Sequence, residues 1–201
     1  MKTDSKNIKL YLIRHGKTYG NTLGRYIGTT DESLCAQGLE ELKSLHYPRV
    51  NLVYVSPLKR CLETASILYP DTERKVIPEL RECDFGSFEN KNYQELNGNP
   101  DYQKWIDSNG SLPFPEGEDQ KQFRSRCCEG FAKAIQDAIE KDLDKIAFVV
   151  HGGTIMSLLD KYSCPHRDFY EWQVKNAMGI EAELIIALWK NNIREVKVHR
   201  N

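Results

Sequence analysis

The sequence has no long apolar run and almost no net charge. Its 201 residues include 28 Lys and Arg against 29 Asp and Glu, which gives a formal net charge of -1. This balance excludes a disordered polyelectrolyte and disfavours a protein that neutralises many nucleic-acid phosphates or binds anionic membranes. The opening MKTDSKNIKL is charged throughout and lacks the apolar segment of a signal peptide or transmembrane helix. We therefore expect no nucleic-acid partner, no membrane partner and a mature chain that starts near Met1.

The cysteines form no pattern typical of a metal site. The chain has no Cys-x-x-Cys pair and no Cys and His spacing of the zinc-finger type. The sequence therefore predicts no metal ligands. We expect reduced thiols that behave as small hydrophobic residues, as in a cytoplasmic protein. The residues concerned are Cys35, Cys61, Cys83, Cys127, Cys128 and Cys164.

Short apolar runs alternate with helical patterns along most of the chain. The runs are rich in β-branched or aromatic residues, which is typical of strands buried in a parallel or mixed sheet. They cover 9–13, 52–55, 75–77 and 146–150. Apolar residues recur at helical spacing over 37–47, 57–68, 119–140 and a segment after 151–153. Ser56 and Pro57 favour the start of the second helix, with Ser as the cap and Pro at the first helical position.

The end of the chain changes to a period of two. Apolar and polar residues alternate over 180–188, a turn is predicted at 190–192, and the pattern returns over 196–198, which indicates a hairpin. The order of elements predicts one three-layer α/β/α domain over 1–201, with a mostly parallel sheet and a C-terminal antiparallel hairpin. The exposed face of the hairpin could pair with a second subunit, so a homodimer is left open.

Residues 84–118 differ in composition from the rest of the chain. They are rich in Gly, Pro, Asn and aromatic residues and have only short helical patterns. We interpret this segment as an insertion or lid over the sheet. Its aromatic residues are most simply a small core of its own; in the alternative, some face the substrate and stack on its leaving group. They are Phe85, Phe88, Tyr93, Tyr102, Trp105 and Phe114.

Charged residues follow the predicted strands. Arg14 and His15 follow the first strand, and Arg60 lies in the helix after the second. Glu82 comes after the third strand, and His151 follows the fourth. Because ligands of open α/β sheets bind outside the carboxyl ends of the strands, we expect these side chains to converge on one site.

These residue types suit phosphate chemistry. Guanidinium groups match phosphate oxygens, and glycines at a helix start, such as Gly152, leave backbone N–H groups open to an anion. A neutral imidazole is a nucleophile toward a phosphoryl group, and nearby positive charge disfavours its protonation. A carboxyl group could protonate the leaving alkoxide and then deprotonate a water. The sequence therefore predicts phosphoryl chemistry on a small-molecule phosphate ester, with no cofactor and no metal.

Several short segments carry a resemblance to a known family. LIRHGKT at 12–18, followed by Asn21, is similar to the signature of the histidine phosphatase superfamily, also called the phosphoglycerate mutase-like family. The other matching segments occur in the family's order and are GTTD at 28–31, SPLKR at 56–60, RECDFG at 81–86 and VHGG at 150–153.

The resemblance implies a phosphoglycerate mutase-like fold and a phosphatase that forms a phosphohistidine intermediate. It implies that His15 is the phosphorylated nucleophile and Glu82 the proton donor. The residues implied to hold the transferred phosphoryl group are Arg14, Arg60 and His151. Further substrate-binding candidates are Asn21, Thr29 and Gly152.

The expected substrate is alpha-ribazole 5′-phosphate, because 25–31 and 102–118 are similar to alpha-ribazole phosphatases of the cobalamin-assembly pathway. The chain departs from these relatives at 116–119, where it reads EGED and they commonly have GGES. Two alternatives stay open. A phosphoglycerate mutase would use the same residues, although those that depend on bisphosphoglycerate are generally longer. A non-catalytic phosphate-binding module would keep the fold, although it would not need a general acid at Glu82.

Overall fold

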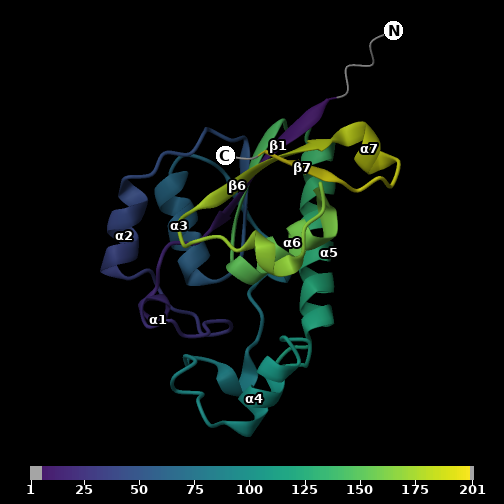
Figure 1. Ribbon diagram of the computed structural model, residues 1–201. Coiled ribbons are helices and arrows are strands. Elements are labelled where there is room, and N and C mark those ends of the chain that lie inside the picture. The colour runs from purple at the N-terminus through teal and green to yellow at the C-terminus, as the bar shows by residue number, and fades with distance from the viewer. Residues whose placement is uncertain (1–5, 200–201) are drawn as a thin grey trace.

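A mixed sheet forms the centre of the protein, as described over residues 6–199 of the computed structural model (Figure 1). Within these residues the sheet has seven strands in the order β3-β2-β4-β1-β6-β7-β5. The strands are β1 (Asn7–Arg14), β2 (Leu52–Val55), β3 (Arg74–Val76), β4 (Lys145–Val150), β5 (Ser163–Cys164), β6 (Gly179–Ile185) and β7 (Val196–Val198). β3, β2, β4 and β1 run parallel, whereas β6 is antiparallel to β1 and β7. The mostly parallel sheet with antiparallel C-terminal strands is thereby confirmed. Of the predicted domain, residues 1–5 and 200–201 lie outside the described residues.

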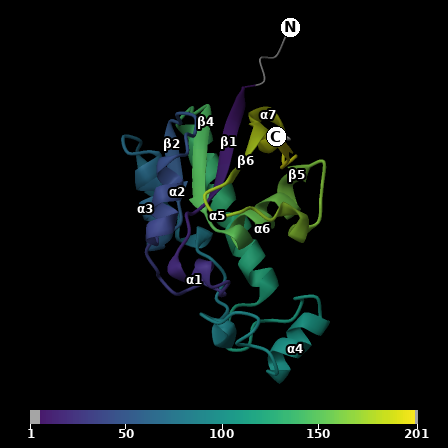
Figure 2. The same cartoon turned by 60° about the vertical axis from the view of Figure 1, so that its left-hand side comes forward.

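Helices cover both faces of the sheet, which confirms the three layers (Figures 1 and 2). The helices are α1 (Tyr19–Thr22), α2 (Ala36–Lys43), α3 (Lys59–Leu68), α4 (Pro100–Asp107), α5 (Gln120–Glu140), α6 (Gly152–Tyr162) and α7 (Ile186–Lys190). Three short 3₁₀ turns are η1 (Pro78–Leu80), η2 (Gly86–Phe88) and η3 (Phe169–Trp172). α2 and α3 lie on one side of the central strands, and α5 and α6 lie on the other. No helix within 6–199 is long and apolar enough to cross a membrane.

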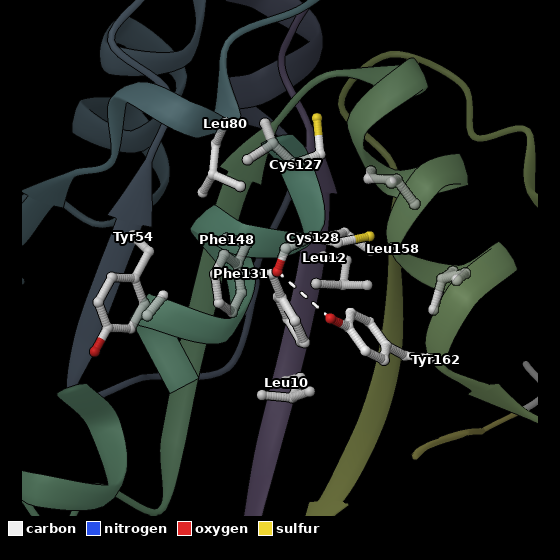
Figure 3. Packing of buried hydrophobic residues seen from close by; sticks show 14 of the residues in the cluster. Leu10, Leu12, Tyr54, Leu80, Cys127, Cys128, Phe131, Phe148, Leu158 and Tyr162 are labelled. Atoms are coloured by element: carbon white, nitrogen blue, oxygen red, sulfur yellow. Dashed lines mark hydrogen bonds between the residues drawn. The ribbon is translucent and has the colours of Figure 1, made fainter. Parts of the chain in front are cut away.

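The alternation of side chains along β1 divides the core between the two faces. Leu10 and Leu12 belong to the cluster packed against α5 and α6, while Tyr11 and Ile13 belong to the cluster packed against α3. Figure 3 shows the larger cluster, in which Phe131 of α5 lies near Leu12 and Phe148. Burial on both faces explains why these strands appear in the sequence as continuous apolar runs.

The third predicted strand is an edge strand rather than a buried one. β3 has three residues, Arg74–Val76, of which the outer two are exposed and the middle one is half-buried. It pairs only with β2 in the described sheet. Its apolar residues were therefore a weaker indication of burial than those of β1, β2 and β4.

The start of α3 differs from the prediction. The helix begins at Lys59, its N-cap is Leu58, and no side chain of that residue caps it. The Ser56 hydroxyl, which was predicted to cap the helix, accepts a hydrogen bond from the N–H of Leu58 at 3.4 Å, just before the helix, and also lies 2.7 Å from Nε2 of His151. The first helical N–H, on Lys59, donates to Oδ1 of Asp31 at 2.7 Å, so a distant loop caps this helix.

The predicted hairpin is interrupted by a helix. β6 ends at Ile185 and α7 occupies 186–190 before β7 returns antiparallel to β6. The helical turn places Trp189 in the core, where its ring centroid lies 5.5 Å from that of Tyr162. Trp189 follows the buried Leu184 by five residues. Because residues an odd number of positions apart point to opposite faces of a strand, a continuous strand would place this indole on the other face of the sheet. β5, which pairs with β7, was not predicted.

Residues 84–118 extend beyond the carboxyl ends of the central strands, with α4 at the far end (Figure 1). Phe88 and Phe114 are buried, and their ring centroids lie 6.0 Å apart. Both belong to the cluster that contains the sheet and α5 residues. The aromatic residues of this segment pack on one another, as predicted, and this group is continuous with the main core; Tyr93 is exposed.

Candidate active site

The ends of β1 and β4 bring the two predicted histidines together. Arg14 is paired with Val150 in the parallel register of these strands, so the residues that follow, His15 and His151, lie side by side. Their ring centroids are 5.1 Å apart and the ring planes meet at 64°. Both side chains are buried. The strand register therefore positions the pair, as the sequence predicted.

His15 is held as a neutral imidazole with a free Nε2. Its Nδ1 lies 2.7 Å from the carbonyl oxygen of Gly16. Because a carbonyl only accepts, Nδ1 carries the proton and Nε2 carries the lone pair. Burial, and then the positive charges of Arg60 and Arg14, lower the pKa of His15 well below its ordinary value. A deprotonated Nε2 at neutral pH is the state that a nucleophile needs.

His151 is bonded to protein groups at both ring nitrogens. Nε of Arg60 donates to its Nδ1 at 3.3 Å, so Nε2 carries the proton and donates to the hydroxyl of Ser56 at 2.7 Å. Burial, and then the charge of Arg60, lower the pKa of His151 well below its ordinary value. This imidazole does not line the cavity described below.

Arg60 is fully buried and donates to a neighbouring loop. Its Nη1 donates to the carbonyl of Thr30 at 2.8 Å, and its Nη2 donates to the carbonyls of Ile27 and Gly28 at 3.2 and 2.8 Å. The guanidinium group is therefore not in the wall of the cavity. Its positive charge nevertheless lowers the pKa of both imidazoles, His15 and His151.

Arg14 and Gly152 lie next to each other at the carboxyl ends of β1 and β4. Nη1 of Arg14 donates to the carbonyl of Val174 at 2.8 Å, while its buried Nε has no hydrogen-bond partner within residues 6–199. Gly152 opens α6, and a Cβ atom there would lie 3.5 Å from Cζ of Arg14. An unpartnered guanidinium N–H and the N-terminus of a helix both favour a negatively charged group.

Glu82 reaches the same cavity from the segment after η1. Its Oε1 accepts a hydrogen bond from the Cys83 N–H at 3.0 Å, and its Oε2 accepts one from the Gly153 N–H at 3.2 Å. Burial raises the pKa of Glu82 even though these bonds and the charges of Arg60 and Arg14 oppose it. A Cβ at position 153 would lie 2.5 Å from Oε1, so a larger residue there would displace this carboxyl group from its present position. The arrangement suits a carboxyl group that donates a proton.

The remaining two predicted residues behave differently. Asn21 lines the cavity, and its Oδ1 accepts from the Thr18 N–H at 3.2 Å and from Nδ2 of Asn176 at 3.1 Å. These bonds orient the amide so that its nitrogen is available to a ligand. Thr29 is exposed and does not line the cavity.

One cavity of about 510 Å³ joins these groups to an aromatic wall. Its polar end includes Arg14, His15, Asn21, Glu82 and Gly152. The rest of the wall includes Tyr26, Phe85, Trp105, Phe114, Phe169 and Tyr170, together with the cations Arg25 and Lys175. Within 6–199, no group of three His, Cys, Asp or Glu side chains could hold a metal ion.

Residues 169–175 form a wall of the cavity that was not predicted from the sequence. This segment includes η3 and the loop before β6, and its Val174 carbonyl accepts the hydrogen bond from Arg14. Five of its residues line the cavity: Phe169, Tyr170, Gln173, Val174 and Lys175. It has neither a regular hydrophobic period nor a motif. The cation among its aromatic residues was the one signal that could have indicated it.

Comparison with known proteins agrees with this geometry. Residues 10–185 match the family described as histidine phosphatase superfamily (branch 1). The chain is 32% identical over 161 residues to the adenosylcobalamin/alpha-ribazole phosphatase of Escherichia coli (strain K12), covering 76% of this chain and 77% of that protein. It is 26% identical over 159 residues to a putative phosphoserine phosphatase 2 of Hydrogenobacter thermophilus, covering 75% and 76%.

The fold is also that of solved structures. A crystal structure of a putative alpha-ribazole-5′-P phosphatase from Escherichia coli superimposes with a TM-score of 0.78 at 23% identity, covering 96% of this chain and 94% of that chain. A phosphoglycerate mutase from Bacillus anthracis superimposes with a TM-score of 0.71 at 23% identity, covering 100% and 95%. The fold is therefore phosphoglycerate mutase-like, and the chain, a phosphatase by its family, belongs to branch 1 of the histidine phosphatase superfamily.

Proposed function

We propose that the protein hydrolyses phosphate monoesters through a phosphohistidine at His15. The observation that carries this proposal is that the free Nε2 of a neutral His15 and the carboxyl group of Glu82 face one cavity. Nε2 attacks phosphorus while the bond from phosphorus to the leaving oxygen breaks, and the proton of Glu82 passes to that oxygen. The Glu82 carboxylate then takes a proton from water, the water oxygen attacks phosphorus, and the bond to Nε2 breaks. Inorganic phosphate leaves and both residues return to their starting states.

The phosphoryl oxygens are bound, in this proposal, at the subsite beside His15. The unpartnered Nε of Arg14, the N-terminus of α6 at Gly152 and the amide nitrogen of Asn21 supply donors there. His151 would bind the phosphoryl group directly only after exchanging a present partner for it, and the Arg60 guanidinium group lies outside the cavity wall. In the geometry described here, the charge of Arg60 stabilises the anion at short range.

The aromatic wall supports a substrate with a planar leaving group. Ring centroids of Tyr26 and Phe85 are 5.3 Å apart, and those of Trp105 and Phe114 are 5.2 Å apart. Residues 84–118, which supply three of these rings, would act as a lid over the cavity. Aromatic surfaces of this kind stack on flat heterocycles. Together with the similarity to an alpha-ribazole phosphatase, this makes alpha-ribazole 5′-phosphate the substrate that we propose.

The six free thiols suit a reducing compartment such as the cytoplasm.

Lys175 favours a second candidate substrate, a phosphate ester that also carries a carboxylate. Its exposed ammonium group lines the cavity and has no ion-pair partner within residues 6–199. The similarity to a phosphoserine phosphatase points the same way. Phosphoserine therefore belongs in any substrate comparison with alpha-ribazole 5′-phosphate.

Rapid-quench labelling tests the mechanism. Mixing the enzyme with a ³²P-labelled ester should give acid-labile, base-stable protein phosphate within the first turnover, and His15→Ala should abolish it. Protein phosphate that survives in this variant would contradict the proposal.

A panel of alpha-ribazole 5′-phosphate, phosphoserine and 3-phosphoglycerate tests the substrate, with the highest kcat/KM expected for the first. Conversion of 3- to 2-phosphoglycerate would instead indicate a mutase. Binding of vanadate without any turnover would indicate a phosphate-binding module.

A further inference from the structure

Arg126 connects α5 to the segment that bears Glu82. Nη1 donates to the carbonyls of Glu79 and Arg81 at 2.7 and 3.0 Å, and Nη2 donates to the carbonyl of Glu82 at 3.4 Å. The guanidinium group lies 5.3 Å over the ring of Phe123, another α5 residue. The two peptide groups that flank the Cα atom of Glu82, the proposed general acid, are therefore both hydrogen-bonded to the Arg126 side chain.

Glu118 orients this guanidinium group from the opposite side. Its Oε1 and Oε2 accept from Nε and Nη2 of Arg126 at 2.9 and 2.7 Å, a bidentate pair whose side chains are only 12% and 14% exposed, respectively. Oε2 also accepts from the Asp84 N–H at 3.4 Å, and the Glu118 N–H donates to the Asp84 carbonyl at 2.9 Å. All five N–H groups of Arg126 are thus used, and Glu118 itself contacts the same segment two residues after Glu82.

The carboxyl group of Glu82 depends on this backbone for its position. Its own side-chain bonds are to the N–H groups of Cys83 and Gly153, so it is held between its own segment and the start of α6. Neither Arg126 nor Glu118 lines the cavity. Loss of the Arg126 bonds would leave the carboxyl group anchored mainly by α6, while the donors around His15 would stay in place.

We propose that Arg126, oriented by Glu118, is a positioning residue that holds Glu82 at the leaving oxygen of the substrate. The proposal rests on the proposed phosphatase mechanism, in which Glu82 is the proton donor. It predicts a defect that depends on the leaving group: an alkoxide needs the proton, whereas 2,4-dinitrophenolate leaves without it.

The test compares the first turnover of two esters in wild type, Arg126→Ala, Arg126→Lys and Glu118→Gln. The alkyl ester is alpha-ribazole 5′-phosphate, or phosphoserine if the wild type prefers it; the aryl ester is 2,4-dinitrophenyl phosphate. We expect phosphoenzyme formation from the alkyl ester to fall about 10–100-fold in Arg126→Ala, with release of dinitrophenolate within about 3-fold of wild type. Guanidinium ion at millimolar concentration should partly restore the alkyl reaction of Arg126→Ala.

Lys133→Ala is the matched control, because Lys133 also joins α5 to Glu79 but through an exposed ion pair with its side chain. It should leave both esters unchanged. Equal losses for the two esters in Arg126→Lys and Glu118→Gln, the variants that best preserve the fold, would show a general structural role and overturn the proposal. No first-turnover product from either ester in the wild type would instead overturn the proposed mechanism.

Discussion

His15 and His151 are neutral for the same physical reasons. Both are buried, and the guanidinium charge of Arg60 adds to the cost of protonating either ring. Their hydrogen bonds to residues 6–199 differ, however: His15 uses only Nδ1, whereas His151 uses both nitrogens. In the sequence both residues follow a predicted strand, and only the structure distinguishes a ring with a free nitrogen from a ring bonded to protein groups at both nitrogens.

Two buried neutral imidazoles should make the fold sensitive to acid. Their folded pKa values lie below the ordinary value of 6.5, so the unfolded chain binds protons first as the pH falls. Stability is then lost below about pH 6.5, at up to ~1.4 kcal/mol per pH unit for each ring. Glu82 acts in the opposite sense, because its pKa in the folded protein is raised. Its contribution to the stability of the fold is therefore present at low pH and is lost as the pH rises through that pKa.

Urea unfolding at about pH 7.5, 6.5 and 5.5 measures this dependence. The free energy of unfolding falls with each pH unit, and His151→Gln should make this fall smaller by the contribution of one ring, up to ~1.4 kcal/mol per pH unit. His166→Gln is the control, because that ring is exposed. An unchanged slope in His151→Gln would show that this imidazole is not held neutral by the fold.

The loop over 27–31 is fixed by contacts from two other elements. Oε1 of Glu89 accepts from the N–H groups of Gly28 and Thr30 at 2.7 and 2.9 Å, while Arg60 binds carbonyls of the same loop. A Cβ at Gly28 would lie 1.9 Å from the Cys83 carbonyl, so this loop approaches the segment of Glu82 more closely than any other residue type would permit.

Removing the Glu89 carboxylate should loosen this loop. We expect Glu89→Ala to lower the free energy of unfolding by about 2–4 kcal/mol, since two short hydrogen bonds to a charged acceptor are lost. Amide exchange at Gly28 and Thr30 should accelerate in the same variant. Glu40→Ala, which removes an exposed ion pair with Lys43, is the control. Unchanged exchange at both amides would contradict the role given to Glu89.

Elements were predictable where burial or a local cap determines them. β2 and the start of α5 at its Asp119 cap match the sequence pattern because their causes are local. The start of α3 could not be predicted, because the Ser56 hydroxyl is bonded to a ring 95 positions away. α7 was missed because the burial of Trp189 against α5 and α6 residues outweighs an alternating pattern. The motifs likewise predicted the end of the cavity that contains His15 and Glu82, whereas the wall at 169–175 depends on tertiary packing alone.

The whole molecule is nearly neutral, yet its charges are unevenly arranged. Arg14 and Arg60 lie beside His15 at the carboxyl ends of the strands, and Lys175 lies on the cavity wall. Arg25, also on the wall, is paired with Glu95. A homodimer through the exposed face of the terminal strands, which the sequence left open, stays a prediction.

A local positive potential on a neutral molecule predicts a small and site-specific salt effect. Lys175→Ala should lower kcat/KM for a dianionic ester by about 2–5-fold at low ionic strength, and the difference should fade at about 0.3 M salt, where exposed charges are screened. Lys145→Ala is the control, because Lys145 is exposed at the start of β4, the end of that strand opposite His151. It should leave kcat/KM unchanged, since its charge is distant from the cavity. Equal effects of the two substitutions would mean that the net charge of the molecule, rather than the charge on the cavity wall, attracts the substrate.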